Sequence, residues 1–254
     1  MRVAIITVAG ESSRFNEGIP EKEKSLKCIY SECGKEDTLL YRLLKKCENM
    51  DRIIIVGGYK YSELDSFCSS TLPEEFSNIE LVYNPHYSDW GSGYSLYLGI
   101  QTSLMYNPDE ILFAEGDLDV DQRSFDAVLA VEGDVITVTN EPIYANKSVV
   151  LYKDENKRYK YVYNSSHGLL RIDGSFSCIF NSGQIWKFCD CKSLKKACSE
   201  FYESDLEGTN LVIIQRYFDS IESGKVTIVT FERWINCNTR DDYKKIKQIG
   251  ELNI

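Results

Sequence analysis

A loop of small residues carrying one arginine follows the first apolar run of the chain. The run covers residues 3–8, and the loop after it reads Ala9-Gly10-Glu11-Ser12-Ser13-Arg14. Small side chains let a phosphate approach backbone N–H groups, and a guanidinium can clamp phosphate oxygens. A second cation follows, Lys24 with Lys22 as the competing candidate, as expected where a polyphosphate is attacked and leaves as pyrophosphate. The alternative interpretation is a strand-to-helix turn without a ligand.

Carboxylates gather at the end of another apolar run. Residues 111–114 are apolar, and Glu115, Asp117 and Asp119 follow at alternating positions. Carboxylates beside a triphosphate are hard oxygen ligands for Mg²⁺, which takes one or two of them together with phosphates and waters. If the strand geometry persists, the period of two puts Asp117 and Asp119 on the same side. We therefore expect Mg²⁺ to bind here, the alternative being a solvated acidic loop that leads into a helix.

A third candidate stretch combines an asparagine, a small-residue turn and a helix start. Asn84 ends an apolar strand, and the turn Gly91-Ser92-Gly93 leads into Tyr94-Ser95-Leu96-Tyr97. These residues could contact a ligand at the strand end. The alternative is a plain loop with a helix cap at Ser92 or Ser95.

The three stretches follow strands that the sequence predicts to lie side by side. Apolar, β-branched runs predict buried strands over 3–8, 52–56, 79–83, 110–115 and 134–140, and helical spacing predicts helices over 39–47 and 60–69. Strands that alternate with helices are typical of a parallel α/β sheet. Ligands of such sheets bind beyond the carboxyl ends of the strands, where Gly58 also falls.

The second half of the chain has a different texture. Short alternating segments between residues 142 and 180 predict antiparallel hairpins with one wet face. Helices are expected over 183–202 and 210–221, followed by a late strand over 226–231. Four tyrosines of the hairpin region could cage a quaternary ammonium or simply pack a half-buried sheet, namely Tyr144, Tyr159, Tyr161 and Tyr163. The nearest cations for an acceptor phosphate are Lys147, Arg158 and Lys160.

Together these residues resemble the signature of the nucleotidyltransferases that activate phosphorylated metabolites, the sugar-1-phosphate pyrophosphorylases and their cytidylyltransferase relatives. The resemblance rests on Ala9-Gly10, Ser13-Arg14, Pro20 and Lys24-x-Leu26, and on Tyr94-Ser95-Leu96-Tyr97, which is similar to the phosphocholine cytidylyltransferase branch. It implies an α/β fold: a Rossmann-like, mostly parallel sheet flanked by helices, with a small antiparallel insertion over the cleft. It also implies a single domain with a nucleotide-binding part (1–141), an acceptor-binding insertion with helices (142–225) and a closing strand and helix (226–254).

The resemblance further implies a role for each candidate residue. Arg14 and Lys24 would be catalytic, because in that family they bind the charge of the α-phosphate and of the leaving pyrophosphate. Asp117 would bind the metal, with Asp119 a weaker candidate, Glu115 a third, and Asn238 in the place of the second aspartate. The residues implied in nucleotide binding are Ala9, Gly10, Ser12, Ser13, Gly58, Asn84, Ser92, Gly93, Ser95 and Gly116.

Composition excludes several classes of protein. The net charge of −10 argues against a general nucleic-acid binder, whereas a few cations can still gather in one cleft. No apolar stretch approaches the ~18 residues of a membrane span, and the N-terminus lacks a leader pattern. We therefore expect a cytoplasmic protein whose nine cysteines are reduced thiols. The two histidines do not suggest a structural zinc site.

The predicted function is Mg²⁺-dependent transfer of CMP from CTP to a small phosphorylated acceptor, with release of pyrophosphate. A sugar-1-phosphate uridylyl- or thymidylyltransferase is the first alternative. A non-catalytic nucleotide-binding regulator is the second, because Val8, Ser12 and Asn238 depart from the usual signature. The acceptor stays open among phosphocholine, 2-aminoethylphosphonate, another phosphorylated amine or amino acid, and a sugar phosphate. The resemblance also suggests a precursor of cell-surface polysaccharide as the product, and the chain could form a homodimer.

Overall fold

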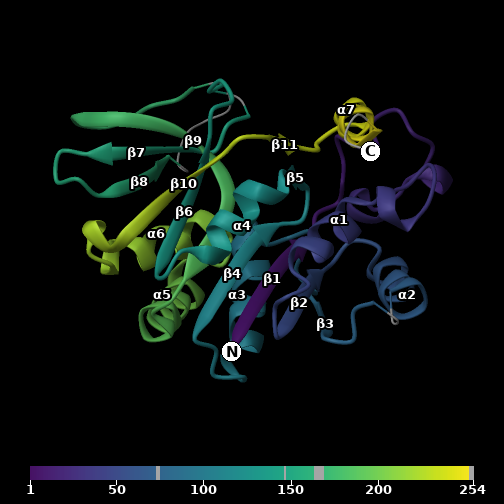
Figure 1. Cartoon of the computed structure of the whole chain (residues 1–254), viewed down its shortest axis with the longest axis horizontal. Helices are drawn as coiled ribbons and strands as arrows, with labels where there is room; N and C mark the ends of the chain where they lie inside the picture. The colour runs from purple at the N-terminus through teal and green to yellow at the C-terminus, as the bar shows by residue number, and fades with distance from the viewer. Residues whose placement is uncertain (73–74, 146, 163–168, 252–254) are drawn as a thin grey trace.

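A twisted mixed sheet forms the centre of the protein (Figure 1). The computed structural model describes residues 1–72, 75–145, 147–162 and 169–251. Within them the main path of the sheet has the order β10-β6-β9-β4-β1-β2-β3, and a hairpin of β7 and β8 extends from β9. The strands are β1 (Arg2–Val8), β2 (Arg52–Gly57), β3 (Ile79–Tyr83), β4 (Glu110–Glu115), β6 (Asp134–Thr139), β7 (Val150–Asp154), β8 (Tyr159–Val162), β9 (Phe176–Phe188) and β10 (Val226–Phe231).

The apolar runs of the first half form parallel strands, as predicted. β1 pairs in parallel with β2 on one side and with β4 on the other, so that Ile5 lies opposite both Ile54 and Phe113. All three of these side chains are fully buried. Strands covered on both faces need apolar side chains on both faces, which is why these segments are continuous hydrophobic runs.

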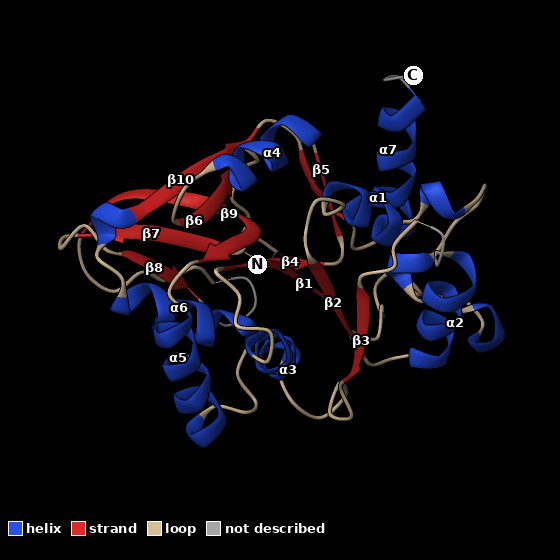
Figure 2. Ribbon diagram, turned by 60° about the horizontal axis from the view of Figure 1, so that its bottom comes forward, coloured by secondary structure: helices blue, strands red, loops and turns tan. Residues whose placement is uncertain are grey.

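Helices cover both faces of the sheet (Figure 2). One face packs against α1 (Leu39–Lys46), α2 (Tyr61–Thr71) and α4 (Gln122–Ala130), which contribute Leu43, Leu64 and Phe125 to one apolar core. The other face packs against α3 (Ser92–Leu104), α5 (Cys191–Ser204) and α6 (Asn210–Ser220). This three-layer arrangement confirms the predicted α/β class.

One predicted helix is wrong in its first part. Residues 183–188 belong to β9, and the helix α5 starts only at Cys191. β9 runs antiparallel to both β4 and β6, and Ile185 and Trp186 are fully buried between them. Pairing on both edges therefore decides the conformation of this segment, and a helix would leave the facing strands without partners.

The predicted antiparallel hairpin is confirmed in the part of the chain that the structure describes. β7 pairs with β8 and with β9, both antiparallel. Tyr163 and the turn at residues 165–168 lie outside the described residues. A second antiparallel pair was not predicted, and it joins β5 (Leu118–Val120) to β11 (Trp234–Asn236) ahead of α7 (Arg240–Glu251).

None of the described helices has the length and apolar character needed to cross a membrane. The division of the chain into three functional parts remains a prediction.

The contact between α3 and the sheet depends on Gly99. A Cβ atom on Gly99 would lie 2.5 Å from Ile5 Cγ2 and 3.3 Å from Val56 Cγ2. We expect Gly99→Val to lower the free energy of unfolding by about 1–3 kcal/mol, because extra methyl groups in a filled core force neighbouring atoms to shift. Urea denaturation measures the change. Gly224→Val is the control, since no atom lies within 4 Å of its Cβ position, and equal stability of the two variants would contradict the prediction.

Candidate active site

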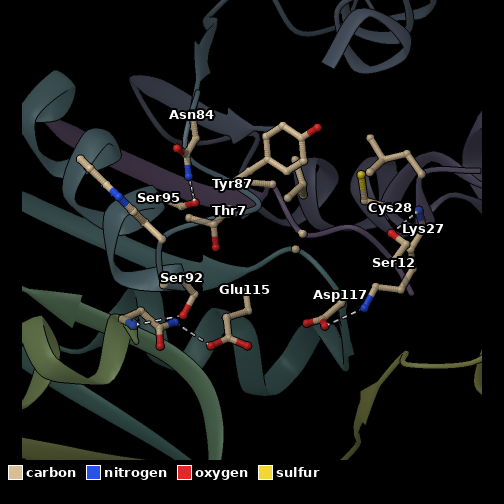
Figure 3. A pocket seen from close by; sticks show the side chains of 18 residues that line it. Thr7, Ser12, Lys27, Cys28, Asn84, Tyr87, Ser92, Ser95, Glu115 and Asp117 are labelled. Carbon is tan, nitrogen blue, oxygen red and sulfur yellow. Dashed lines mark hydrogen bonds and ion pairs between the residues drawn. The ribbon is translucent and has the colours of Figure 1, made fainter. Parts of the chain in front are cut away.

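A cavity of about 270 Å³ opens at the carboxyl ends of β1 and β4 (Figure 3). We call it the central cavity. Its wall combines the loop after β1, the turn after β4, the segment between β3 and α3, and the start of α6. The lining residues are Thr7, Val8, Ala9, Gly10, Ser12, Leu26, Lys27, Cys28, Asn84, Tyr87, Trp90, Gly91, Ser92, Ser95, Glu115, Gly116, Asp117 and Asn210.

The loop after β1 presents backbone to this cavity. Ala9, Gly10 and Ser12 line it, and no atom lies within 4 Å of the position that a Cβ of Gly10 would take. Ser12 adopts a left-handed conformation with φ of 56°, and its hydroxyl accepts a hydrogen bond from the backbone N–H of Lys27 at 3.1 Å. This bond fixes the loop against the segment that carries Lys27. The loop therefore leaves its backbone open to the cavity, and phosphate binding there remains a prediction.

Asp117 and Lys27 form the charged pair of the central cavity. Lys27 Nζ donates to Asp117 Oδ2 at 2.8 Å, and both side chains are mostly buried. The other carboxylate oxygen, Oδ1, is buried and has no hydrogen-bond partner among the described residues. A buried carboxylate oxygen without a partner is costly, so this atom is suited to a ligand that supplies a positive charge or a donor.

The prediction that Asp119 faces the same site is not supported by the geometry. Gly116 and Asp117 form a turn between β4 and β5, so the strand period is interrupted between the two aspartates. Asp119 is buried on β5 and forms an ion pair with Arg233, and it does not line the central cavity. A cation already compensates this carboxylate.

Glu115 is a half-buried acid in the wall of the cavity. Its Oε1 accepts a hydrogen bond from Asn210 Nδ2 at 2.7 Å, and its Oε2 accepts one from Gln184 Nε2 at 3.1 Å. Burial and, to a smaller extent, the neighbouring Asp117 carboxylate raise the pKa of Glu115 to about 7, whereas Asn210 and Lys27 oppose the shift. Near neutral pH this side chain is therefore poised between its neutral and charged forms.

Polar groups from β3 and α3 form the opposite wall. Asn84 is buried, donates from Nδ2 to Ser95 Oγ at 2.9 Å, and accepts a hydrogen bond from the backbone N–H of His86 at 2.8 Å. Ser92 Oγ accepts a hydrogen bond from the backbone N–H of Asn210 at 3.2 Å. Asn84 thus holds Ser95 in place, and Ser92 ties α3 to the start of α6.

Arg14 and Asn238 lie together but outside the central cavity. Arg14 Nη2 donates to Asn238 Oδ1 at 2.8 Å, and both residues line a second cavity of about 440 Å³. The backbone N–H of Cys237 donates to the Asp117 carbonyl oxygen at 2.8 Å. This bond holds the segment that carries Asn238 beside the turn that carries Asp117.

Of the other site residues predicted from the sequence, some line a cavity and others pack behind its wall. Lys24 forms an ion pair with Glu21 at 2.6 Å and lines a third cavity with Ser13, away from Asp117. A Cβ on Gly58 would lie 2.4 Å from Tyr87 Cβ, and one on Gly93 would lie 2.5 Å from Phe201 Cε2. These two glycines allow close packing behind the wall. Gly116 lines the central cavity itself.

The sequence analysis missed several lining residues, among them Lys27, Tyr87, Trp90 and Asn210. Lys27 lies three positions after Lys24, so motif spacing alone could not separate the two lysines. Trp90 stacks on His86 with ring centroids 3.7 Å apart. Aromatic residues between a strand and a helix could have been considered as a stacking surface. Asn210 gave no local signal, because α6 brings it to the cavity from a distant part of the sequence.

A small aromatic cluster anchors the loop that carries Arg14. Phe15 is buried against Tyr30 with ring centroids 5.3 Å apart, and Tyr30 contacts Tyr243 of α7 at 5.0 Å. The guanidinium of Arg240 lies 3.8 Å from the centroid of the Tyr30 ring. We call these four residues the aromatic anchor. It fixes the position of the loop after β1 against α7.

The central cavity offers a metal ion one carboxylate oxygen without a partner among the described residues. Among the described residues, no group of three or more His, Cys, Asp or Glu side chains could hold a metal ion. Asp117 offers one unpartnered oxygen, and Mg²⁺ commonly takes one or two carboxylates, with phosphates and waters completing its shell. The carbonyl oxygen of Asn238 already accepts a hydrogen bond from Arg14. Asp117 is therefore the best candidate ligand.

The amino-acid sequence matches a known protein family. The family described as "Domain of unknown function (DUF6564)" matches residues 23–250. The chain belongs to this family. Choline-phosphate cytidylyltransferase of Haemophilus influenzae is 26% identical over 224 residues, which cover 86% of this chain and 81% of that protein.

Solved structures of nucleotidyltransferases share the fold of this family member. A CTP:phosphocholine cytidylyltransferase from Streptococcus pneumoniae aligns with a TM-score of 0.68 at 18% identity and covers 98% of this chain and 99% of its own. An inositol-1-phosphate CTP transferase from T. maritima aligns with a TM-score of 0.67 at 16% identity and covers 99% and 97%. The fold and the resemblance to nucleotidyltransferases are therefore confirmed.

The raised pKa of Glu115 predicts a pH dependence of stability. Because its pKa is raised to about 7 in the folded protein, its contribution is complete below the unfolded value of about 4.3 and is lost as the pH rises through 7. Relative to Glu115→Gln, the wild type should lose up to about 3 kcal/mol between pH 5 and pH 8, since one pKa unit corresponds to about 1.4 kcal/mol. Urea titrations of both proteins with a chelator present measure this difference, and parallel pH profiles would refute it.

Proposed function

We propose that this protein is a Mg²⁺-dependent cytidylyltransferase that transfers CMP from CTP to a small phosphorylated acceptor. The observation that carries the proposal is the pairing of Lys27 with Asp117, whose second oxygen has no partner among the described residues, beside the small-residue loop. The fold is that of the cytidylyltransferases compared above. The similarity to the choline-phosphate enzyme extends over 86% of the chain and supports CTP as the donor.

The loop and Lys27 would bind the triphosphate. Backbone N–H groups around Gly10 and the ammonium of Lys27 can receive phosphate oxygens in a partly buried site, where fixed charges act more strongly than in water. Asp117 would hold Mg²⁺, which when bound neutralises charge on the phosphates. Once a ligand draws the Lys27 ammonium toward its phosphates, the Asp117 carboxylate becomes available to the metal.

The reaction needs no general base from the protein. An oxygen of the acceptor phosphate forms a bond to the α-phosphorus, while the bond from this phosphorus to the bridging oxygen of pyrophosphate breaks. The attacking group is already an anion, so no proton has to be removed. Catalysis then consists of positioning and of stabilising the charge on the leaving group. We assign the stabilisation of the leaving group to Lys27, which lines the central cavity, and the positioning of the acceptor phosphate to Arg14, which lines the second cavity.

The base would lie on the wall formed by α3. Trp90 and Tyr87 offer aromatic faces, and the hydroxyls of Ser92 and Ser95 offer hydrogen bonds in the same cavity. Asn84 would act indirectly, because both ends of its amide already bond to Ser95 and to His86. A homodimer, a cytoplasmic location and a role in making polysaccharide precursors remain predictions.

Nucleotide specificity can be tested by thermal denaturation. A ligand that binds the folded state raises the melting temperature, so CTP with Mg²⁺ should raise it by several degrees, and by more than UTP, ATP, GTP or dTTP. A larger shift with UTP or dTTP would favour a sugar nucleotide enzyme. Binding of CTP without pyrophosphate release from any phosphorylated acceptor would favour a regulator.

Two matched lysine variants test whether Lys27, and not Lys24, is the cation that binds the phosphates. Lys27→Met should lower kcat/KM by about 100-fold or more, since a charge that stabilises the leaving group is worth several kcal/mol. Lys24→Met should have a much smaller effect, because Lys24 is paired with Glu21 outside the central cavity. A larger loss of kcat/KM in Lys24→Met than in Lys27→Met would support Lys24, the residue predicted from the sequence. Circular dichroism checks that both variants are folded.

Asp117→Asn tests the proposed metal ligand. Replacing the carboxylate should lower turnover by orders of magnitude and raise the Mg²⁺ concentration that is needed for half-maximal rate. Pyrophosphate release measured over a range of Mg²⁺ concentrations gives both quantities. Wild-type turnover with an unchanged Mg²⁺ requirement would exclude Asp117 as the ligand.

A further inference from the structure

The second cavity is lined by residues that do not line the central cavity. Its wall combines Arg14, the segment after β6 with Glu141 and Lys147, Asn181 of β9, and Asn236 of β11. In Figure 1, β11 follows β10 and leads toward α7, and α7 contributes Asp242 and Lys245 to the wall of the cavity. At about 440 Å³, the cavity has room for a small organic molecule.

A chain of hydrogen bonds connects the two cavities. Glu115 of the central cavity accepts from Gln184 Nε2 at 3.1 Å, and Gln184 Oε1 accepts from Asn236 Nδ2 at 3.0 Å. Asn236 lines the second cavity. The two cavities are therefore neighbours, and a molecule in the second cavity would lie next to the phosphate-binding loop through Arg14.

Two cations of the second cavity are available to an anion. Within the described residues, neither Arg14 nor Lys147 forms an ion pair: Arg14 donates to the neutral Asn238, and Lys147 Nζ lies 4.2 Å from the ring centroid of Tyr144. By contrast, Lys245 lies 3.8 Å from the carboxylate of Asp242. Arg14 and Lys147 could therefore receive the phosphate of an acceptor.

Two buried amide oxygens in the same wall have no partner among the described residues, Asn181 Oδ1 and Asn236 Oδ1. The orientation of Asn181 follows from its surroundings, because its Nδ2 faces the carbonyl oxygens of Glu141 and Pro142, each at 3.4 Å. Asn181 is only 4% exposed. Buried acceptors of this kind are rare and costly unless a donor reaches them, so the wall calls for a ligand with N–H or O–H groups.

Among the described residues, the tyrosines considered from the sequence as an aromatic cage do not gather around this cavity. Of the described tyrosines, Tyr144 lines it, but the ammonium of Lys147 already lies over that ring. Tyr161 is buried and accepts a hydrogen bond from Trp186 Nε1 at 2.6 Å. Tyr159 lies 5.2 Å from the ammonium of Lys153. Trp234 also lines the cavity, with its Nε1 bonded to the carbonyl oxygen of Gly183 at 2.9 Å. The ring faces of Tyr144 and Trp234 do not make the several-sided cage that suits a trimethylammonium group, which has no donor of its own.

We propose that the second cavity binds the acceptor and selects molecules whose non-phosphate end carries hydrogen-bond donors. The acceptor class is a phosphorylated or phosphonate compound with a primary ammonium or hydroxyl groups, in preference to one with a quaternary ammonium. Arg14 and Lys147 receive its phosphate, and Asn181 and Asn236 accept from its donors. This inference rests on the proposed nucleotidyl transfer and defines its second substrate.

Three acceptors distinguish the outcomes: phosphoethanolamine, sn-glycerol 3-phosphate and phosphocholine. With CTP and Mg²⁺, at least one of the first two should release pyrophosphate with kcat/KM at least about tenfold above that of phosphocholine, because a site built to bond N–H or O–H groups rejects analogues without them. The better substrate of these two shows whether an ammonium group or a hydroxyl group donates the hydrogen bonds. Equal or faster turnover of phosphocholine would overturn the inference and leave nucleotidyl transfer intact.

A measurement of nucleotide binding shows which of the two proposals has failed, nucleotidyl transfer or the selection of the acceptor. If CTP raises the melting temperature and none of the three acceptors is used, the acceptor inference is wrong. If no nucleotide raises the melting temperature and no pyrophosphate appears, nucleotidyl transfer itself is wrong.

Substitution of Asn181 tests its proposed role as a hydrogen-bond acceptor for the second substrate. Asn181→Leu should lower the preference for the donor-bearing acceptor over phosphocholine by about tenfold, and Asn181→Asp, which keeps an acceptor oxygen, should retain it. The preference is a ratio within one protein, so a loss of folded enzyme does not change it. Asn156→Leu, at an exposed turn, is the matched control. An unchanged ratio in Asn181→Leu would overturn the assignment.

Discussion

The position of β1 between two parallel neighbours is the constraint on which the site depends. Pairing on both sides brings the carboxyl ends of β1, β2 and β4 to one edge, and backbone hydrogen bonds extend this alignment into the loops. Gly116 N donates to Thr7 O at 3.0 Å, and Tyr59 N donates to Ala9 O at 3.0 Å. The small-residue loop after β1 and the turn that carries Asp117 are thereby tied to each other through the sheet. Side chains from distant segments can then meet with little freedom to drift apart, which is what catalysis by positioning requires.

The electrostatics of the central cavity follow from the same alignment. Glu115 and Asp117 lie on either side of Gly116, and Lys27 is the cation that faces them. Two carboxylates this close disfavour each other's charge, and burial makes Glu115 the one that holds its proton more readily. Asp117 is compensated by Lys27 at only one of its oxygens. The cavity is thus prepared for additional positive charge.

Sequence reasoning succeeded where one segment determines its own environment. Continuous apolar runs predicted the parallel strands, and the small-residue loop and Asp117 were placed at the correct edge. The predictions were wrong where contacts with distant segments decide the conformation. Residues 183–188 became a strand because β4 and β6 hold them from both sides, and Asp119 turned away because a turn interrupts the strand period. Lys24 and Lys27 have the same chemistry and nearly the same position in the chain, so only the fold could tell them apart.

The aromatic anchor joins the beginning of the chain to its far end. Phe15 and Tyr30 are held by Tyr243 and Arg240 of α7, more than 200 residues away along the sequence. During synthesis the strands of the sheet emerge before α7 does. The sheet can therefore begin to assemble early, while the loop that carries Arg14 gains its support only when α7 has docked. Under the proposed function, competence for catalysis would then depend on this docking step and not on the sheet alone.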